Sequence, residues 1–154
     1  MSYETEEILE EEIEFPWLIF KLNNNLYTIN SKFITSIVIK PEEITYVPIV
    51  SDYITGLIHL RGNVVPLIDL KLLFKINNQN TENTKEMVIV LEKDNSFAGL
   101  VVDEVLSVEN IIAFEESDEI KKVVKDGFVK GVAKGTKSED VLLIIDEEKI
   151  MNIT

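Results

Sequence analysis

Two short apolar runs, separated by a tight polar turn, place the strongest constraint on how this chain can fold. The runs are residues 57–60 and 64–68, and Arg61-Gly62-Asn63 lies between them. Glycine and asparagine tolerate the positive φ angles of tight turns, so the segment predicts a β-hairpin with those two residues in its turn. Pro66 has no N–H group for a strand ladder. The second strand is therefore expected at a sheet edge, or Pro66 at a bulge.

Short apolar runs continue along the rest of the chain and alternate with turn residues, as in a β-rich protein. Further strands are expected at residues 17–22, 26–29, 33–39, 86–92, 97–102, 105–108, 131–133 and 141–145, and the first arm of the hairpin begins near residue 53. Brief helices are expected after Asp69, at 117–125 and after Asp146. Many short strands with few helices favour a pair of β-barrels over a sandwich.

Two segments repeat the same order of features: strand, turn, strand, aspartate and short helix. The first spans residues 54–73 and has Asp69 before its helix, and the second spans 129–151 and has Asp146. Aspartate is a preferred N-cap residue, which explains its place in both segments. The repetition predicts two similar half-units.

The charge of the chain argues against several classes of partner. It has 28 acidic and 15 basic residues and a formal net charge of −13, with no dense basic cluster free of acidic neighbours. Nucleic acid and anionic membrane surfaces are disfavoured, because phosphate binding depends on clustered lysine and arginine. No apolar run approaches the roughly 20 residues of a membrane-spanning helix, and a signal-peptide pattern is absent. A cytoplasmic location is expected.

Glutamate dominates residues 1–14. These glutamates repel one another, and Ile8, Leu9 and Ile13 offer too little apolar surface to offset the entropy of ordering. A mobile acidic tail is therefore expected ahead of a domain at 15–153. The spacing of the three apolar residues leaves a partner-binding helix as the alternative.

Residues suited to catalysis or metal binding are scarce. The chain has no cysteine and a single histidine, His59, which excludes thiolate chemistry and a two-histidine metal site. A nucleophile elbow, a phosphate-binding loop and EF-hand spacing are absent. Asp103 and Glu104 are adjacent in a strand and point to opposite faces, so they do not form a catalytic pair. An enzyme is not expected, and neither is a cofactor or a metal.

The hairpin and its surroundings resemble the signature of the CheW-like bacterial chemotaxis coupling proteins. Residues 56–70 read Gly-Leu-Ile-His-Leu-Arg-Gly-Asn-Val-Val-Pro-Leu-Ile-Asp-Leu, which departs from the family pattern only at His59, where asparagine is usual. Further matches lie at residues 20–22, 27–29, 98–105, 128–133 and 142–146. The resemblance therefore extends over about residues 15–153.

The resemblance implies a mainly β fold of two small SH3-like barrels packed together. Subdomain 1 would comprise about residues 15–62 and 141–153, and subdomain 2 about residues 63–140. The chain would thus return to the first barrel at its end.

The resemblance also implies a function. The chain would be a non-catalytic adaptor that couples the cytoplasmic tips of methyl-accepting chemoreceptors to the regulatory domain of the histidine kinase CheA, at receptor arrays on the inner face of the membrane. A CheW-like scaffold or ligand-sensing module of another chemosensory or motility pathway is the alternative. A ligand-sensing module would need polar groups that converge on a pocket.

Partner-binding residues carry over from the family by position. Arg61 is one of them, and arginine is enriched in interface hot spots, although a solvated turn arginine is the alternative. The others are Ile34, Gly56, Gly62, Asn63, Val64, Met87, Val88 and Val108. For Val88 and Val108, core packing explains the residue type equally well. Ser36 stands where the family usually has an acidic residue, so Arg61 would need another partner if that acid normally neutralises it.

Overall fold

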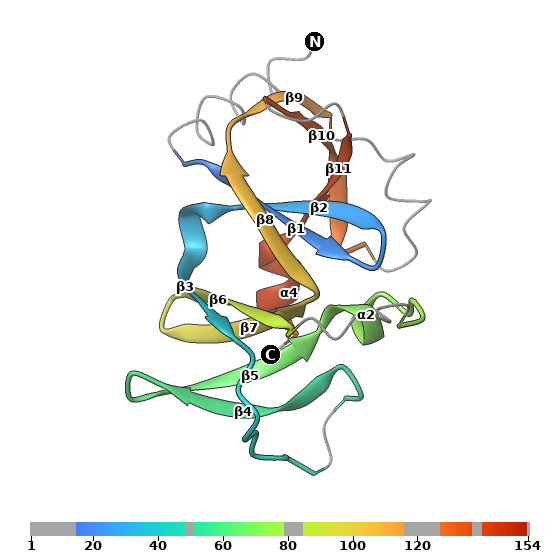
Figure 1. Cartoon of the computed structure of the whole chain (residues 1–154). Coiled ribbons are helices and arrows are strands. Elements are labelled where there is room, and N and C mark those ends of the chain that lie inside the picture. Colours follow the sequence, from blue (N-terminus) through green and yellow to red (C-terminus); the bar gives the residue numbers. More distant parts are fainter. Residues whose placement is uncertain (1–14, 49–50, 79–84, 116–126, 137–139, 154) are drawn as a thin grey trace.

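The strands of the computed structural model form two sheets, which Figure 1 shows one above the other. The structure describes residues 15–48, 51–78, 85–115, 127–136 and 140–153. The expected acidic tail at 1–14 and the expected helix at 117–125 lie outside these residues. A mainly β fold with brief helices is confirmed.

The upper sheet in Figure 1 has six strands in the order β8-β1-β2-β11-β10-β9. Its strands are β1 (Trp17–Leu22), β2 (Asn25–Asn30), β8 (Glu104–Glu109), β9 (Ile111–Glu115), β10 (Val129–Gly135) and β11 (Val141–Ile145). The lower sheet has five strands in the order β3-β6-β7-β5-β4. Its strands are β3 (Ile34–Ile39), β4 (Ile54–Leu60), β5 (Asn63–Asp69), β6 (Met87–Lys93) and β7 (Ser96–Val102). The helices are η1 (Ser31–Phe33), α2 (Leu70–Leu73) and α4 (Glu147–Asn152).

The sequence predicted every strand except β9, whose residues run directly into an acidic segment. It also predicted both half-units, and the structure confirms them. The Asp69 and Asp146 carboxylates accept hydrogen bonds of 3.0 to 3.2 Å from backbone N–H groups in the first turns of α2 and α4. Their own N–H groups donate to Tyr53 at 2.8 Å and to Phe128 at 2.7 Å, before the first strand of each unit.

The two halves of the chain, from β1 to α2 and from β6 to α4, exchange strands. The first half contributes β3 to pair with β6, and the second half contributes β8 to pair with β1. In the same way β5 runs parallel to β7, and β11 runs parallel to β2. Each sheet therefore contains strands from both halves, and neither half can complete its sheet alone. The subdomain boundaries near residues 62 and 140 stay a prediction.

The turn of the β4–β5 hairpin differs from the expectation. Positive φ angles occur at Arg61 (52°) and Gly62 (83°), not at Gly62 and Asn63. Asn63 instead pairs with Leu60 and begins β5. Two successive residues with positive φ are typical of the tight turns that match strand twist, so Arg61 holds an uncommon backbone conformation at the tip.

The expectation that Pro66 marks an edge strand or a bulge was wrong. β5 lies between β4 and β7, and the hairpin register is regular at Pro66. Pairing with β7 begins at Leu67, one residue later. Leu57, which lies opposite Pro66, exchanges backbone hydrogen bonds of 2.8 and 3.0 Å with Thr45 instead. Leu57 and Pro66 are therefore a pair without hydrogen bonds across the hairpin. The proline therefore costs the ladder no hydrogen bond.

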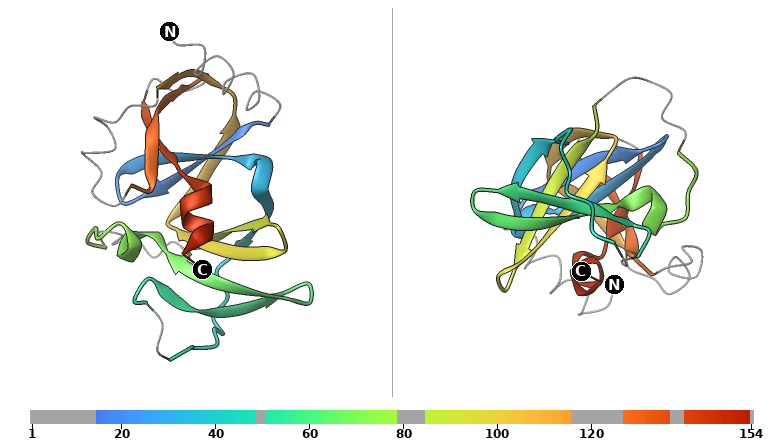
Figure 2. Two further views of the ribbon diagram at one scale, coloured as in Figure 1. Left: turned by 180° about the vertical axis from the view of Figure 1, so that it is seen from behind. Right: turned by 90° about the horizontal axis from the view of Figure 1, so that it is seen from below.

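A single large core joins the two sheets. Phe20 and Ile29 from the upper sheet and Ile68 and Leu100 from the lower sheet are all fully buried in it. α4 lies between the sheets at the back of the molecule and adds Ile150 to the same core (Figure 2). Burying one such side chain stabilises the fold by about 1.5–3 kcal/mol, so the core fixes one sheet against the other.

Glu147, the first residue of α4, is a buried carboxyl group that is only 6% exposed. Its Oε2 atom lies 3.9 Å from Lys130 Nζ and accepts no hydrogen bond from the residues that the structure describes. Burial raises the pKa of Glu147 above its usual 4.5, and the nearby Lys130 ammonium only partly opposes this.

This carboxyl predicts a specific pH dependence. Because the folded pKa exceeds the unfolded one, the folded state holds the extra proton, and stability falls as pH rises from about 4.5 through the folded pKa. Glu147→Gln should make the free energy of unfolding fall less with pH. The difference should be about 1.4 kcal/mol for each unit by which the folded pKa of Glu147 exceeds the unfolded one. Urea unfolding at several pH values measures it. Glu148→Gln is the control, because Lys93 lowers the pKa of Glu148 and its contribution has the opposite sign. Equal slopes for parent and Glu147→Gln would contradict the assignment.

Candidate partner-binding surface

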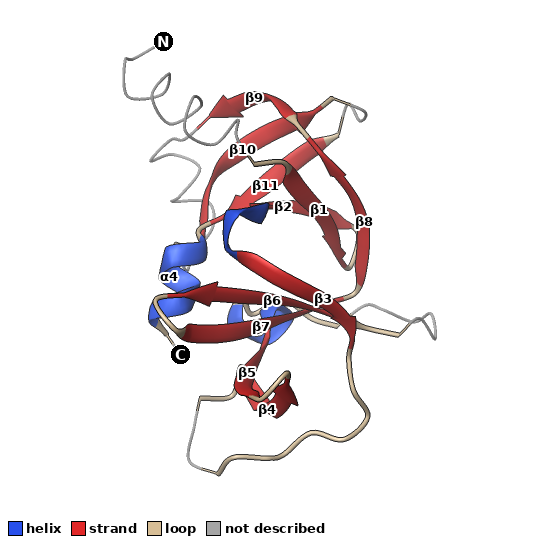
Figure 3. Cartoon of the chain, turned by 90° about the vertical axis from the view of Figure 1, so that its left-hand side faces the viewer, coloured by secondary structure: helices blue, strands red, loops and turns tan. Residues whose placement is uncertain are grey.

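Strand β3 forms one edge of the lower sheet, and strand β8 forms one edge of the upper sheet. Both strands expose apolar side chains at alternate positions. On β3, Ile37 is 39% and Ile39 55% exposed, and on β8, Leu106 is 44% and Val108 48% exposed. Alternate strand residues share a face, so each strand presents an apolar row. Figures 1 and 3 show both strands on the same side of the molecule, with the end of β3 turned toward the start of β8. We call these four residues the edge-strand surface.

The repeat of the fold relates the two rows. The register of β3 with β6 shifts after Ile34, and the register of β8 with β1 shifts after Val105. Ile34 and Val105 both pack, partly buried, against the large core. Ile37 comes three residues after Ile34, and Val108 three residues after Val105, and both are exposed. The two halves thus place equivalent apolar side chains on one surface.

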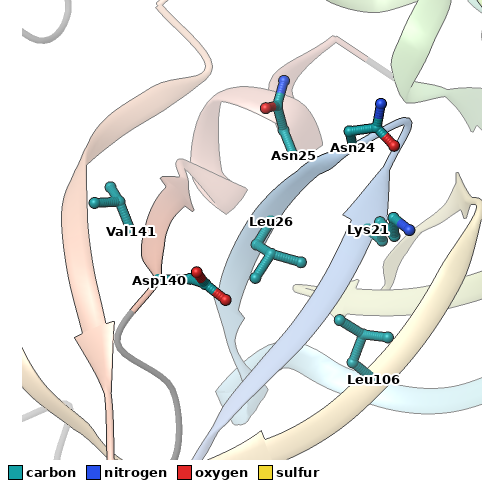
Figure 4. Close-up of a pocket in the computed structure, with 7 residues that line it drawn as sticks. All are labelled: Lys21, Asn24, Asn25, Leu26, Leu106, Asp140 and Val141. Carbon is teal, nitrogen blue, oxygen red and sulfur yellow. The ribbon is translucent and has the colours of Figure 1, made fainter.

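A hollow of about 480 Å³ adjoins the β8 part of this surface (Figure 4). Its lining combines polar and apolar side chains, namely Lys21, Asn24, Asn25, Leu26, Leu106, Asp140 and Val141. Leu106 belongs both to this lining and to the edge-strand surface, so the apolar row of β8 continues into the hollow.

The residues expected at the hairpin tip are all on the surface. Arg61, Gly62, Asn63 and Val64 are exposed, and Val64 is 48% exposed. Strand registers place this tip at the same end of the five-stranded sheet as Ile34, but at the opposite edge. The hairpin tip is therefore formed by other strands of the sheet than β3.

Met87 and Val88 lie at the other end of that sheet. Met87 is partly buried and pairs with the exposed Ile39, so it borders the edge-strand surface. Val88 is fully buried and packs in a cluster with Val65 and Leu67. The core-packing interpretation thus applies to Val88, whereas the exposed Val108 lies on the edge-strand surface.

Gly56, another residue carried over from the signature, is buried rather than exposed. A Cβ atom at this position would overlap the Ile44 Cγ2 methyl and lie 2.8 Å from the Thr45 carbonyl oxygen. Thr45 pairs with Leu57, so the segment that follows β3 runs directly against β4 here. Glycine is required for this close approach, which gives Gly56 a packing role.

The model of the CheW-like domain matches residues 16–154 of the chain. The chain belongs to the CheW-like family. The chemotaxis protein CheW of Klebsiella aerogenes is 31% identical over 139 residues, which cover 88% of this chain and 81% of that protein. CheW of Bacillus subtilis is 30% identical over 136 residues, which cover 88% and 80%.

A solved structure of the family has the same fold. The crystal structure of the scaffolding protein TtCheW from Thermoanaerobacter tengcongensis matches with a TM-score of 0.74 and 30% identity, covering 86% of this chain and 88% of that one. The predicted pair of SH3-like subdomains is thereby confirmed. This CheW-like chain is a chemotaxis coupling adaptor without catalytic activity, as the sequence predicted.

The side chains that the sequence offered for catalysis or metal binding lie elsewhere in the fold. Asp103 is buried and Glu104 exposed, so these neighbours point to opposite faces as expected. His59 is exposed on β4. Within the described ranges, no three histidine, aspartate or glutamate side chains are grouped so that they could hold a metal ion. None of the helices in those ranges is long and apolar enough to cross a membrane.

Ser36, which replaces the usual acidic residue of the family, lies on β3 opposite Val90. Arg61 lies across the whole sheet from it, at the tip of the β4–β5 hairpin. The chain therefore lacks, at position 36, the negative charge that the family usually has there.

The sequence missed Ile37, Ile39 and Leu106, which make up most of the edge-strand surface. Residues 34–39 read Ile-Thr-Ser-Ile-Val-Ile, with apolar residues on both faces of the strand. Such a run is also typical of a strand buried on both sides, and only the position of β3 at the sheet edge shows which residues are exposed.

Proposed function

We propose that this adaptor couples chemoreceptor cytoplasmic tips to the regulatory domain of the kinase CheA. The edge-strand surface carries the proposal, because it offers four exposed aliphatic side chains from two sheets on one side of the molecule. Exposed apolar patches mark sites of protein contact, and an amphipathic helix buries its apolar face in such places. Receptor tips, which present helices, are the partner that fits it.

The hairpin tip is the proposed kinase surface. Arg61, Asn63 and Val64 combine a cation, an amide and an apolar side chain, all exposed at the end of the five-stranded sheet. The regulatory domain of CheA resembles CheW-like proteins, so contact between similar barrel ends is expected. The tip belongs to β4 and β5, and the receptor surface to β3 and β8, so the proposal gives each partner its own strands. Coupling would then be positional, through affinity for both partners.

Arg61→Glu tests the kinase surface. The fold should be retained, because a surface charge of this kind changes stability by roughly 1 kcal/mol or less. Binding of the CheA regulatory domain should weaken about tenfold or more, since the new carboxylate replaces a cation at the contact. Isothermal titration calorimetry measures the affinity, and thermal unfolding checks the fold.

Arg61→Asn is the matched control, because asparagine tolerates the positive φ of this position and removes the charge without reversing it. Its affinity for the CheA regulatory domain should lie between those of the parent and Arg61→Glu. Equal kinase binding by all three proteins would remove Arg61 from the interface.

The same proposal places the protein at receptor arrays on the inner face of the membrane. A fluorescent fusion should form clusters that require the receptors. Clusters that persist in cells without chemoreceptors would contradict this location.

A further inference from the structure

A buried ion pair lies where the chain crosses from the lower sheet to the upper one. Lys71 Nζ is 2.6 Å from Asp103 Oδ1, and both side chains are only 8% exposed. Asp103 is the single residue between β7 and β8, and Lys71 belongs to α2. The pair therefore fixes the point at which β8 begins.

Asp103 also connects this point to the rest of the upper sheet. Its Oδ2 atom accepts a 2.7 Å hydrogen bond from the N–H of Asn23, in the β1–β2 turn. Its own N–H donates to the Lys21 carbonyl oxygen at 3.1 Å. Lys71 Nζ donates in addition to Asn78 Oδ1 at 2.8 Å. One carboxylate thus joins α2, the β1–β2 turn and the start of β8.

The equivalent crossing of the first half, from β2 to β3, is built differently. Glu148 of α4 follows Asp146 by the same interval at which Lys71 follows Asp69. Glu148 pairs with Lys93 at 2.9 Å, but its side chain is 66% exposed. Exposed pairs are screened by solvent and hold geometry weakly, whereas a buried pair is directional. The start of β8 is thus fixed by buried charges, and the start of β3 is not.

We propose that Lys71 and Asp103 are positioning residues, which set the place of β8 relative to β3 and thereby the geometry of the edge-strand surface. Both are buried and cannot contact a partner themselves. Leu106 and Val108 follow Asp103 directly along β8, so a change at the crossing moves both. The consequence for receptor binding rests on the proposed function, whereas the structural consequence does not.

The structural consequence is measured as the distance between β3 and β8. The chain has no cysteine, so Ile37→Cys with Val108→Cys accepts two spin labels for double electron–electron resonance. In this background, Lys71→Met with Asp103→Asn removes both charges together and keeps an acceptor for Asn23. No lone charge is then left buried, and the variant should fold. The distance distribution should broaden or shift by roughly one strand residue, about 3 Å.

Lys93→Met with Glu148→Gln is the control, because it removes the exposed pair between α4 and the end of β6, beside Phe33 of η1. Its distribution should equal that of the parent. A parent-like distribution in the folded Lys71→Met/Asp103→Asn protein would overturn the proposal, whatever partners the protein binds.

The two charge-removing pairs of substitutions, made in the parent chain without the cysteines, then report on binding. Affinity for a chemoreceptor signalling fragment should fall about tenfold in Lys71→Met/Asp103→Asn, while affinity for the CheA regulatory domain stays unchanged. A parent that binds no receptor fragment would refute the proposed function and leave the distance result to decide the positioning role. A shifted distance with unchanged receptor affinity would overturn the link between positioning and binding.

Discussion

Ile37→Glu combined with Val108→Glu should weaken binding of a chemoreceptor signalling fragment by about a hundredfold. Both side chains are exposed, at 39% and 48%, and occupy equivalent positions on β3 and β8. Against an apolar helix face, each carboxylate would have to be desolvated without a partner, which is costly. In the free protein the same carboxylates face water, so the free energy of unfolding should change by roughly 1 kcal/mol or less.

Calorimetric titration and urea unfolding measure the two effects separately. Leu72→Glu is a matched control, because Leu72 is 49% exposed and belongs to α2 rather than to β3 or β8. It should bind the receptor fragment like the parent. If the double variant also binds like the parent, the edge-strand surface is not the receptor site.

Gly56→Val should destabilise the protein by about 2–4 kcal/mol. The new side chain would overlap the Ile44 methyl and crowd the Thr45 carbonyl group, and backbone cannot move aside as a flexible side chain can. The pairing of Thr45 with Leu57 would have to open. The effect should appear in urea unfolding, as a lower midpoint at an unchanged slope.

Gly62→Asn provides the comparison within the same hairpin. A Cβ atom at Gly62 would meet nothing within 4 Å, and asparagine tolerates its φ of 83°. This variant should lower the free energy of unfolding by roughly 1 kcal/mol or less. Equal losses from the two variants would show that the close packing at Gly56 is not what requires glycine there.

Local signals predicted much of this fold. Turn residues and apolar runs marked the hairpins, and the aspartates at 69 and 146 marked both helix starts, because an N-cap acts within a few residues of itself. The β4–β5 turn was located correctly, but the residue with unusual backbone was Arg61 rather than Asn63. Turn propensities describe average preferences, and the strand register decided which residues held the turn.

Long-range pairing was not predictable in the same way. Pro66 indicated an edge strand, yet β5 is internal, because its parallel ladder with β7 starts just after the proline. The exchange of β3 and β8 between the halves has no local signal either. For that reason the sequence left core packing and an interface as equal alternatives for Val88. It did not show that Gly56 is buried, or that Ile37 and Leu106 are exposed.

The most direct test of the adaptor role is simultaneous binding of both partners. Analytical ultracentrifugation of the protein with a chemoreceptor signalling fragment and the CheA regulatory domain should show one complex that contains all three. Saturation with either partner should leave the affinity for the other equal or higher. Competition between the receptor fragment and the kinase domain for the adaptor would contradict two separate surfaces, and with them the proposed coupling.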